Sequence, residues 1–114
     1  MKIFNKSKET IVAERVEIAD TVVSRLIGLL NRPSLSTEEA LIITQCRSIH
    51  MFFMKFPIDV LFIDKNNVVI GVVKEIQPFR MSPYFFKASK AIELAAGTVK
   101  KTKTEVGDFL EIRE

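Results

Sequence analysis

The sequence predicts a mainly β protein, a compact antiparallel barrel or sandwich with one short α-helix. Short segments rich in β-branched and aromatic residues recur along the chain and are separated by turn residues. Only one stretch has the apolar spacing of an amphipathic helix. A chain of 114 residues is long enough for one hydrophobic core and too short for two, so we expect a single domain over residues 1–114.

Seven segments carry the strand pattern. The first alternates imperfectly between apolar and charged residues, and the fourth has a continuous apolar run, which is typical of a strand covered on both faces. The predicted strands span residues 10–19, 40–44, 48–54, 59–64, 68–73, 89–95 and 107–113. Between two of them, the sequence DKNN at 64–67 predicts a hairpin, because Asp and Asn tolerate positive φ and bond their own backbone.

The helix candidate lies within residues 20–33, and we expect it to be helical over about residues 20–31. Asp20 is the expected N-cap, and Pro33 follows the expected end. Between them a broad apolar face is formed by Val22, Val23, Leu26, Ile27, Leu29 and Leu30. Gly28 costs such a helix about 1 kcal/mol relative to alanine, which suggests close packing there or simple tolerance.

Composition excludes several classes of protein. With 47% hydrophobic and 27% charged residues the chain is globular, and one cysteine cannot form an internal disulfide. The net charge is +3, and the densest basic stretch, 100–103, lacks interleaved aromatic residues, which argues against nucleic acid as a partner. The chain shows no signal peptide and no apolar run of roughly 18 residues. We therefore expect a small basic cytoplasmic protein with no membrane span.

The only cysteine and the only histidine lie close together, in 46–54. In an extended strand Cys46, Ser48 and His50 would share one side, but residues four apart in a strand are separated by about 13 Å. Cys46 and His50 therefore cannot form a catalytic pair there, and we interpret Cys46 as a small buried hydrophobe. For His50 two interpretations stay open: a half-buried imidazole bonded to a carbonyl or carboxylate, or a group that transfers protons or binds a ligand. No ligand-spaced cluster is present, so we expect no metal and no cofactor.

Several motifs, in order, make the chain resemble the DUF192 family of small prokaryotic proteins, a domain of unknown function. They are SRLIGLLNRPSL (24–35), CRSIHMFFMKFPIDVLFID (46–64), PFRMSP (78–83), AIELAAGT (91–98) and VGDFLEI (106–112). The resemblance implies a compact, mostly β domain and no particular reaction. The polar positions that it marks are Ser48, His50, Asp59, Asp64, Arg80, Glu93, Gly97, Thr98, Gly107 and Asp108. Ala95 departs from the proline that the family often has there.

Four of these polar residues are the strongest candidates for a site, and two interpretations compete. In the first, Arg80 pairs with the carboxylates of Asp59 and Glu93 and fixes the loop 77–87 to the barrel. In the second, the loop 77–87 is a lid with an apolar wall, and His50, Asp59, Arg80 and Glu93 converge in a pocket beneath it. Arg80 would then orient a carboxylate or phosphate.

The function that we expect is a non-catalytic ligand- or peptide-binding or accessory domain, with its pocket under the loop 77–87 and an anionic small molecule or a peptide as ligand. The candidate binding residues are Ser48, His50, Asp59, Arg80 and Glu93. One alternative is a small hydrolase or acid–base enzyme that uses His50 with Asp59 or Glu93, so the sequence leaves enzymatic activity open while favouring its absence. A second alternative is a scaffold in a larger assembly, which exposed phenylalanines among residues 79–86 would favour.

Overall fold

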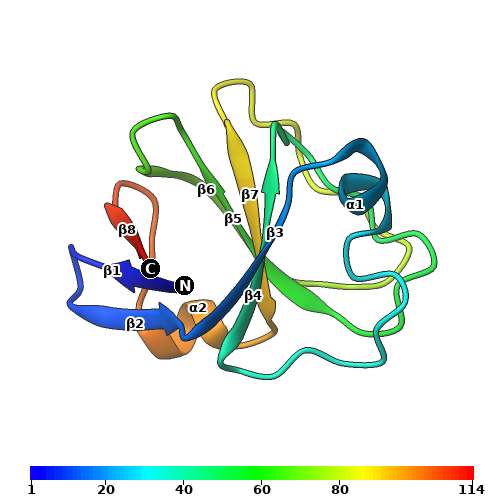
Figure 1. The fold of residues 1–114 in the computed structure, drawn as a ribbon, viewed down its shortest axis with the longest axis horizontal. Coiled ribbons are helices and arrows are strands. Elements are labelled where there is room, and N and C mark those ends of the chain that lie inside the picture. Colours follow the sequence, from blue (N-terminus) through cyan, green and yellow to red (C-terminus); the bar gives the residue numbers. More distant parts are fainter.

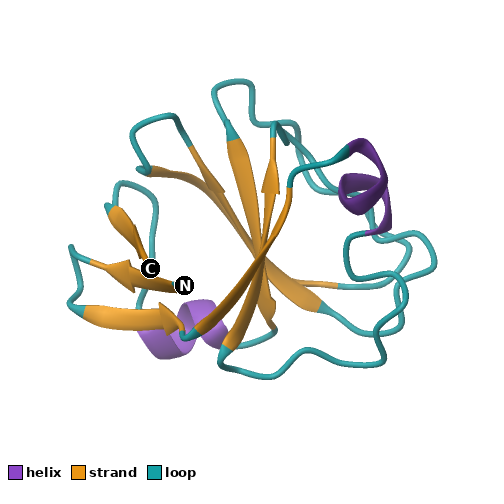
Figure 2. Ribbon diagram, in the orientation of Figure 1, coloured by secondary structure: helices purple, strands orange, loops and turns teal.

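A computed structural model describes residues 1–114, with eight strands and two short helices (Figure 1, Figure 2). The elements in chain order are β1 (Lys2–Asn5), β2 (Thr10–Ala13), β3 (Arg15–Ala19), α1 (Val22–Ile27), β4 (Glu39–Thr44), β5 (Ile58–Ile63), β6 (Val69–Ile76), β7 (Lys90–Ala95), α2 (Thr98–Thr102) and β8 (Leu110–Arg113). Neither helix has the length and apolar character needed to cross a bilayer.

The strands form two sheets. The smaller has the order β2-β1-β8, and the larger has the order β3-β4-β7-β5-β6. All pairs are antiparallel except β3 with β4, which run parallel. The mainly β prediction is confirmed, and the arrangement is the sandwich alternative, because the sheets do not close into a barrel.

Both faces of the large sheet are buried, and each face has its own core. The inter-sheet core lies between the two sheets and includes Ile3, Val12, Leu110, Ile42, Leu61, Ile63, Ile92 and Leu94. The loop-covered core lies on the opposite face and includes Leu29, Leu41, Ile43, Ile49, Met51, Met54, Val60, Phe62 and Ala91. Because side chains alternate along a strand, neighbouring residues of β4, β5 and β7 belong to different cores.

The continuous apolar run of β5 forms as predicted, and all six of its residues are buried. The hairpin at 64–67 forms as well. The carboxylate of Asp64 accepts the N–H groups of Asn66 and Val68 at 2.8 and 3.0 Å, and Asn67 has a φ of 62°. Asp and Asn thus fill the turn role expected of them.

The strand predicted over 48–54 is wrong. This segment is a loop in which only His50 pairs, through an isolated bridge to Met81. Phe53 has a φ of 65°, in a turn where the Met54 N–H donates to the Met51 carbonyl at 3.2 Å. The apolar residues of this loop, among them Ile49, Met51 and Met54, cover one face of the large sheet. Their burial gives the segment the apolar pattern that is typical of a strand.

The remaining differences concern where elements start and stop. The predicted strand 10–19 divides at Glu14 into β2 and β3, which belong to different sheets, and neither β1 nor α2 was predicted. The predicted helix 20–31 shrinks to Val22–Ile27. Its N-cap is Thr21, in a capping box with Ser24, and not Asp20. Gly28, with a φ of 51°, ends the helix, and no residue of α1 is buried.

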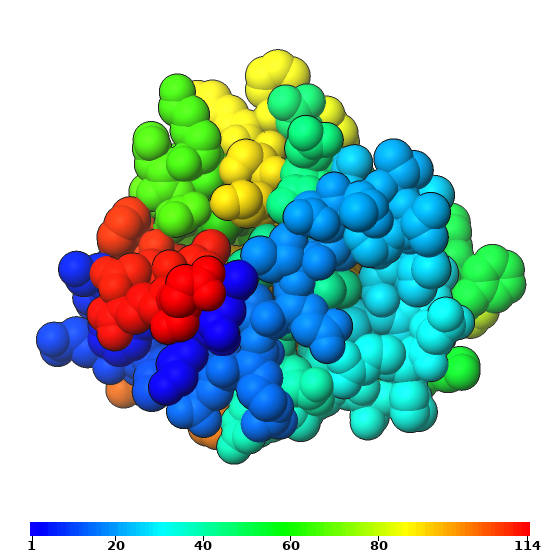
Figure 3. Space-filling model, in the orientation of Figure 1, coloured from blue at the N-terminus to red at the C-terminus, as the bar shows by residue number.

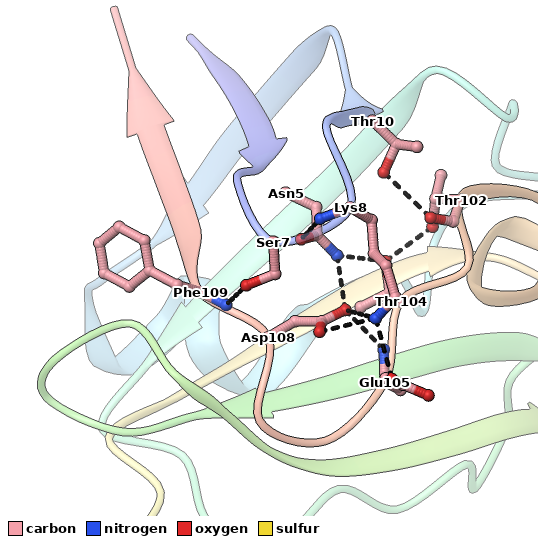
Figure 4. A network of polar contacts seen from close by, with 9 residues as sticks. All are labelled: Asn5, Ser7, Lys8, Thr10, Thr102, Thr104, Glu105, Asp108 and Phe109. Atoms are coloured by element: carbon pink, nitrogen blue, oxygen red, sulfur yellow. Dashed lines mark hydrogen bonds and ion pairs between the residues drawn. The ribbon is translucent and has the colours of Figure 1, made fainter.

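A polar cluster attaches the N-terminal hairpin to the C-terminal segment (Figure 4). The buried amide of Asn5 donates to Asp108 at 2.9 Å and to Thr104 at 3.2 Å. The ammonium of Lys8 reaches Asp108 at 2.8 Å, and Asp108 also accepts the backbone N–H of Glu105 at 3.0 Å. Residues about 100 positions apart in the sequence are thereby joined beside the small sheet.

Candidate functional site

The candidate site is a small cavity of about 100 Å³ between α1 and the loop-covered face of the large sheet. We call it the α1 cavity. Its wall combines apolar side chains with a few polar groups, which is the usual composition of a ligand pocket. The lining residues are Arg25, Leu26, Ile27, Gly28, Leu29, Leu30, Ile43, Cys46, Ser48, Ile49, His50, Met54 and Glu93.

Glu93 lies in the middle of β7 and is only 5% exposed. Its Oε1 is buried and has no hydrogen-bond partner, and the side chain forms no ion pair. Burial raises the pKa of this carboxyl from 4.5 to about 7. The backbone of Gly28 passes close by, since a Cβ built on it would lie 3.7 Å from Oε1 of Glu93. The residue is therefore an unpartnered acid at the edge of a cavity.

Arg25 brings a second unpartnered polar atom to the same cavity. One terminal nitrogen of its guanidinium donates to the carbonyl of Gln45 at 3.1 Å, and the other lies 3.5 Å from the Gln45 side-chain oxygen. The Nε atom is buried and has no partner. The arginine is thus held by its tip while its Nε–H remains available as a donor. Arg25 was not predicted as a site residue, although the motif resemblance includes an arginine in this helix.

The thiol and the imidazole at the cavity have different surroundings. Cys46 is half-buried and donates to the Ser48 carbonyl at 3.1 Å, and burial raises the pKa of its thiol. His50 is exposed and stacks on Phe52 with 5.2 Å between ring centroids. No hydrogen bond or ion pair involves its imidazole, so of the two interpretations the half-buried imidazole bonded to a carbonyl or carboxylate is wrong. His50 and Glu93 line one cavity without contact between them that would orient a proton.

Asp59 lies elsewhere, for a reason of strand geometry. It pairs with Leu94, one position along from Glu93, so the two carboxylates point to opposite faces of the large sheet. The Asp59 carboxylate accepts three backbone N–H groups, from Glu75 at 2.8 Å, Gly97 at 3.1 Å and Val99 at 2.9 Å. The carboxylate is fully engaged in holding β6 and the start of α2.

Arg80 does not reach either acid. It is exposed and forms no ion pair, so the expected network with Asp59 and Glu93 is absent. The loop 77–87 is instead fixed by its backbone to the segment 47–51. The bonds include Phe79 N–H to the Met51 carbonyl and Met51 N–H to the Arg80 carbonyl, both at 2.7 Å.

A larger, open cavity of about 820 Å³ does adjoin the end of the loop 77–87. Its wall includes Arg47, Tyr84, Phe86 and Lys87 together with the hairpin residues 64–66. None of the five predicted binding residues lines it. The structure thus brings Ser48, His50 and Glu93 together in the α1 cavity and leaves Asp59 and Arg80 outside it. No group of three or more His, Cys, Asp or Glu side chains is placed to hold a metal ion.

Comparison with known proteins gives relatives of the same kind. The model of the DUF192 family, described as "Uncharacterized ACR", matches residues 3–112. A UPF0127 protein of Thermococcus sibiricus is 34% identical over 113 residues, which cover 96% of this chain and 73% of that protein. A UPF0127 protein of Pyrococcus abyssi is also 34% identical, with 96% and 95% covered.

Solved structures share the fold. A protein of unknown function from Novosphingobium aromaticivorans superposes with a TM-score of 0.83 at 20% identity, covering 97% of this chain and 82% of that one. A candidate transcription regulator from Sinorhizobium meliloti superposes with a TM-score of 0.76 at 24% identity, covering 96% and 89%. At these identities the likeness concerns the fold alone. The match along nearly the whole sequence is decisive for the family: the chain belongs to the uncharacterised DUF192 family, together with the UPF0127 proteins.

Proposed function

We propose that the chain is a non-catalytic binding domain and that the α1 cavity receives a small amide group of its ligand. The observation that carries this proposal is that two residues lining this cavity, Glu93 and Arg25, each have a buried atom without a hydrogen-bond partner, Oε1 and Nε respectively. A buried polar atom without a hydrogen bond costs roughly 1–3 kcal/mol, so a ligand that supplies partners to both recovers this free energy.

An amide suits the two free groups. The Nε–H of Arg25 is a donor and requires an acceptor, which a carbonyl oxygen provides. The carboxyl of Glu93 accepts when ionised, and an amide N–H₂ donates to it. Both functions sit on one planar group, and the apolar neighbours Leu29 and Met54 would contact the adjoining methylene carbons. Asparagine and glutamine side chains of a peptide have this chemistry, which keeps the peptide ligand expected from the sequence and replaces the anionic one.

The enzymatic alternative has one observation in its favour. A carboxyl whose pKa is about 7 is suited to proton transfer near neutral pH. The Glu93 carboxyl lacks a catalytic partner oriented by a hydrogen bond, since no such bond joins Glu93 to His50. The nearby Cys46 thiol has a raised pKa, which disfavours the nucleophilic thiolate. Binding therefore remains the better-supported proposal.

The test uses three small probes of matched shape: butyramide, butyrate and 2-pentanone. We expect butyramide to shift the NMR signals of Glu93, Gly28 and the Arg25 Nε–H in a saturable way, with a dissociation constant in the millimolar range appropriate to a fragment. Both other probes lack the N–H₂ group, and butyrate is also negatively charged. They should shift these signals at least tenfold less.

Variants make the assignment specific. Glu93→Leu should abolish the butyramide shifts, whereas Glu111→Gln, which alters an acid on β8, should leave them unchanged. Equal shifts with 2-pentanone would mean that the cavity does not recognise the amide N–H₂ group, and shifts confined to other parts of the molecule would remove the cavity as the site. Either outcome overturns the proposal.

A further inference from the structure

The exposed apolar side chains of this protein are concentrated at one end of the molecule. Ten of the fourteen large hydrophobic residues that are exposed fall within three short segments. We call this set the apolar end: Val22, Val23, Leu26, Ile27, Phe52, Phe53, Phe79, Met81, Tyr84 and Phe86. Leu26, Phe53 and Phe86 are 71%, 76% and 76% exposed, so these side chains project into solvent instead of packing on the domain.

The three segments lie against one another. The rings of Phe53 and Phe79 are in edge contact at 5.9 Å, and His50 bridges to Met81. The helix α1 adjoins the loop that carries Phe52, since Leu26 and Ile27 line the α1 cavity together with His50. In Figure 1, α1 and the green loop after residue 50 lie on the side opposite the small sheet, and Figure 3 shows both on the outer surface there. Contiguous apolar surface of this kind marks an interaction site.

The charges in the two loops of the apolar end are of one sign. The segments 45–57 and 77–88 contain no Asp or Glu, and their charged residues are Arg47, Lys55, Arg80 and Lys87. All four are exposed, and none forms an ion pair. Two acids lie nearby: Asp64 lines the open cavity with Tyr84 and Phe86, and the exposed Asp20 precedes α1. The four unpaired cations outnumber them, so the apolar end is complementary to a surface that is apolar inside and negatively charged at its face.

We propose that the apolar end docks on a membrane containing anionic lipids. Aliphatic and aromatic side chains would enter the boundary between headgroups and acyl chains, and the four cations would meet the lipid phosphates. A single-stranded nucleic acid would use the cations and the aromatic rings, but it would leave Val22, Val23 and Leu26 in water. Those aliphatic side chains favour acyl chains over bases as the occupant. The surface lies beside the α1 cavity but is independent of what that cavity binds.

The primary experiment is co-sedimentation of the full chain with vesicles of phosphatidylcholine and phosphatidylglycerol at 3:1, and with vesicles of phosphatidylcholine alone. We expect binding to the mixed vesicles and at least tenfold weaker binding to the neutral ones. The chain has no tryptophan, so Phe53→Trp provides a single emission probe. Its emission should shift to the blue when mixed vesicles are added, since an interfacial indole leaves water.

Matched pairs of variants separate the docking surface from general effects. The double change F53S/F79S should weaken binding at least tenfold, whereas I11S/V106S, which removes two exposed apolar residues of the opposite end, should not. Likewise R80Q/K87Q should weaken binding more than K100Q/K101Q, although both remove two positive charges. Circular dichroism would verify that each variant folds.

Two results would overturn the proposal. One is failure of the wild-type chain to sediment with the mixed vesicles. The other is equal loss of binding in the test and control pairs, which would show attraction of the whole basic protein without a defined surface. Binding of oligo-dT that F53S/F79S abolishes, without vesicle binding, would assign the apolar end to nucleic acid instead.

Discussion

Glu93 is an acidic side chain in an environment that opposes its charge. Val60 and Leu41 are its strand partners on either side, and no hydrogen-bond donor reaches its carboxyl group. The neutral form is therefore favoured in the folded chain, and burial raises the pKa to about 7. A residue kept in this state destabilises the domain at neutral pH, which is typical of a position retained for binding or chemistry.

The raised pKa of Glu93 predicts a loss of stability with rising pH. Between the unfolded pKa of 4.5 and the folded pKa of about 7, the folded chain holds a proton that the unfolded chain has released. The free energy of unfolding should therefore fall over this interval by about 3 kcal/mol and then level off. Urea unfolding of the wild-type chain at pH 4.5, 6, 7 and 8 measures this fall in the free energy of unfolding.

Glu93→Gln is the control for this pH dependence, because it keeps the shape and removes the titration. Its stability should change by less than about 1 kcal/mol over the same interval, and it should exceed that of the wild-type chain at pH 8. All other ionisable groups are the same in both proteins. Parallel pH profiles would show that Glu93 does not titrate in this range.

At the scale of elements, Asp59 of β5 bonds through its side chain to two other elements, β6 and α2. Its three backbone partners lie at the bend of β6, where Glu75 has a φ of 49°, and at the start of α2, where Gly97 has a φ of 94°. Asp59→Ala should lower the free energy of unfolding by about 2–5 kcal/mol, since one buried and two part-buried N–H groups lose their acceptor.

The comparison variant for Asp59 is Asp64→Ala, which removes an acceptor for two N–H groups in an accessible turn. Water replaces that acceptor, so we expect a loss of about 1 kcal/mol. Chemical denaturation gives both values. A small effect of Asp59→Ala, together with altered butyramide shifts, would contradict the structural role and return Asp59 to the binding site.

Gly71 is the second element-scale feature, because the absence of a side chain there creates the seat for Phe85. It pairs with Phe62 across the strands, and the ring of Phe85 stacks on Phe62 at 4.4 Å. A Cβ on Gly71 would lie 2.3 Å from Cε1 of Phe85. Gly71→Ala should therefore cost about 1–3 kcal/mol by displacing the ring that anchors the loop 77–87.

The same substitution in a Phe85→Ala background should cost less than about 0.5 kcal/mol or even stabilise, because the clash is gone and alanine suits a strand better than glycine. A double-mutant cycle measured by thermal unfolding tests this coupling. Additive effects would mean that the cost arises within β6 and not from Phe85.

The sequence predicted correctly those elements whose residue pattern follows from their own burial. The prediction was wrong where contacts with distant parts of the chain determine the structure. The run in β5 indicated a strand covered on both faces, and it is one. The alternation in 48–54 came from a loop that seals the sheet, which local periodicity does not distinguish from a strand. Asp59 and Glu93 were grouped as acids, but their shared register, which no single sequence reveals, places them on opposite faces.

At the scale of the whole molecule, the two sheets share one core, and the cluster of Figure 4 attaches the hairpin of β1 and β2 to the segment between α2 and β8. Twelve buried residues form the inter-sheet core, eleven from the two sheets and Val99 from α2. Asp108 accepts hydrogen bonds from Asn5, Lys8 and Glu105. Burial alone would raise the pKa of Asp108, but the bonds from Asn5 and Lys8 outweigh it and lower the pKa below its usual value. Its contribution to stability is present above pH 4 and is lost as pH falls through the lowered pKa.

Asp108→Ala should therefore destabilise both sheets together, by about 2–4 kcal/mol at pH 7, because Asn5 and the Glu105 N–H lose their acceptor beside the shared core. Amide hydrogen exchange gives the measurement: protection in β1 and in β5 should fall by the same free energy, as in a single cooperative domain. Glu105→Gln, which removes the exposed ion pair with Lys8 and keeps the backbone N–H that Asp108 accepts, is the control and should leave protection unchanged. If β1 lost protection while β5 kept it, the small sheet would be a separate unit and the single domain predicted from the chain length would be wrong.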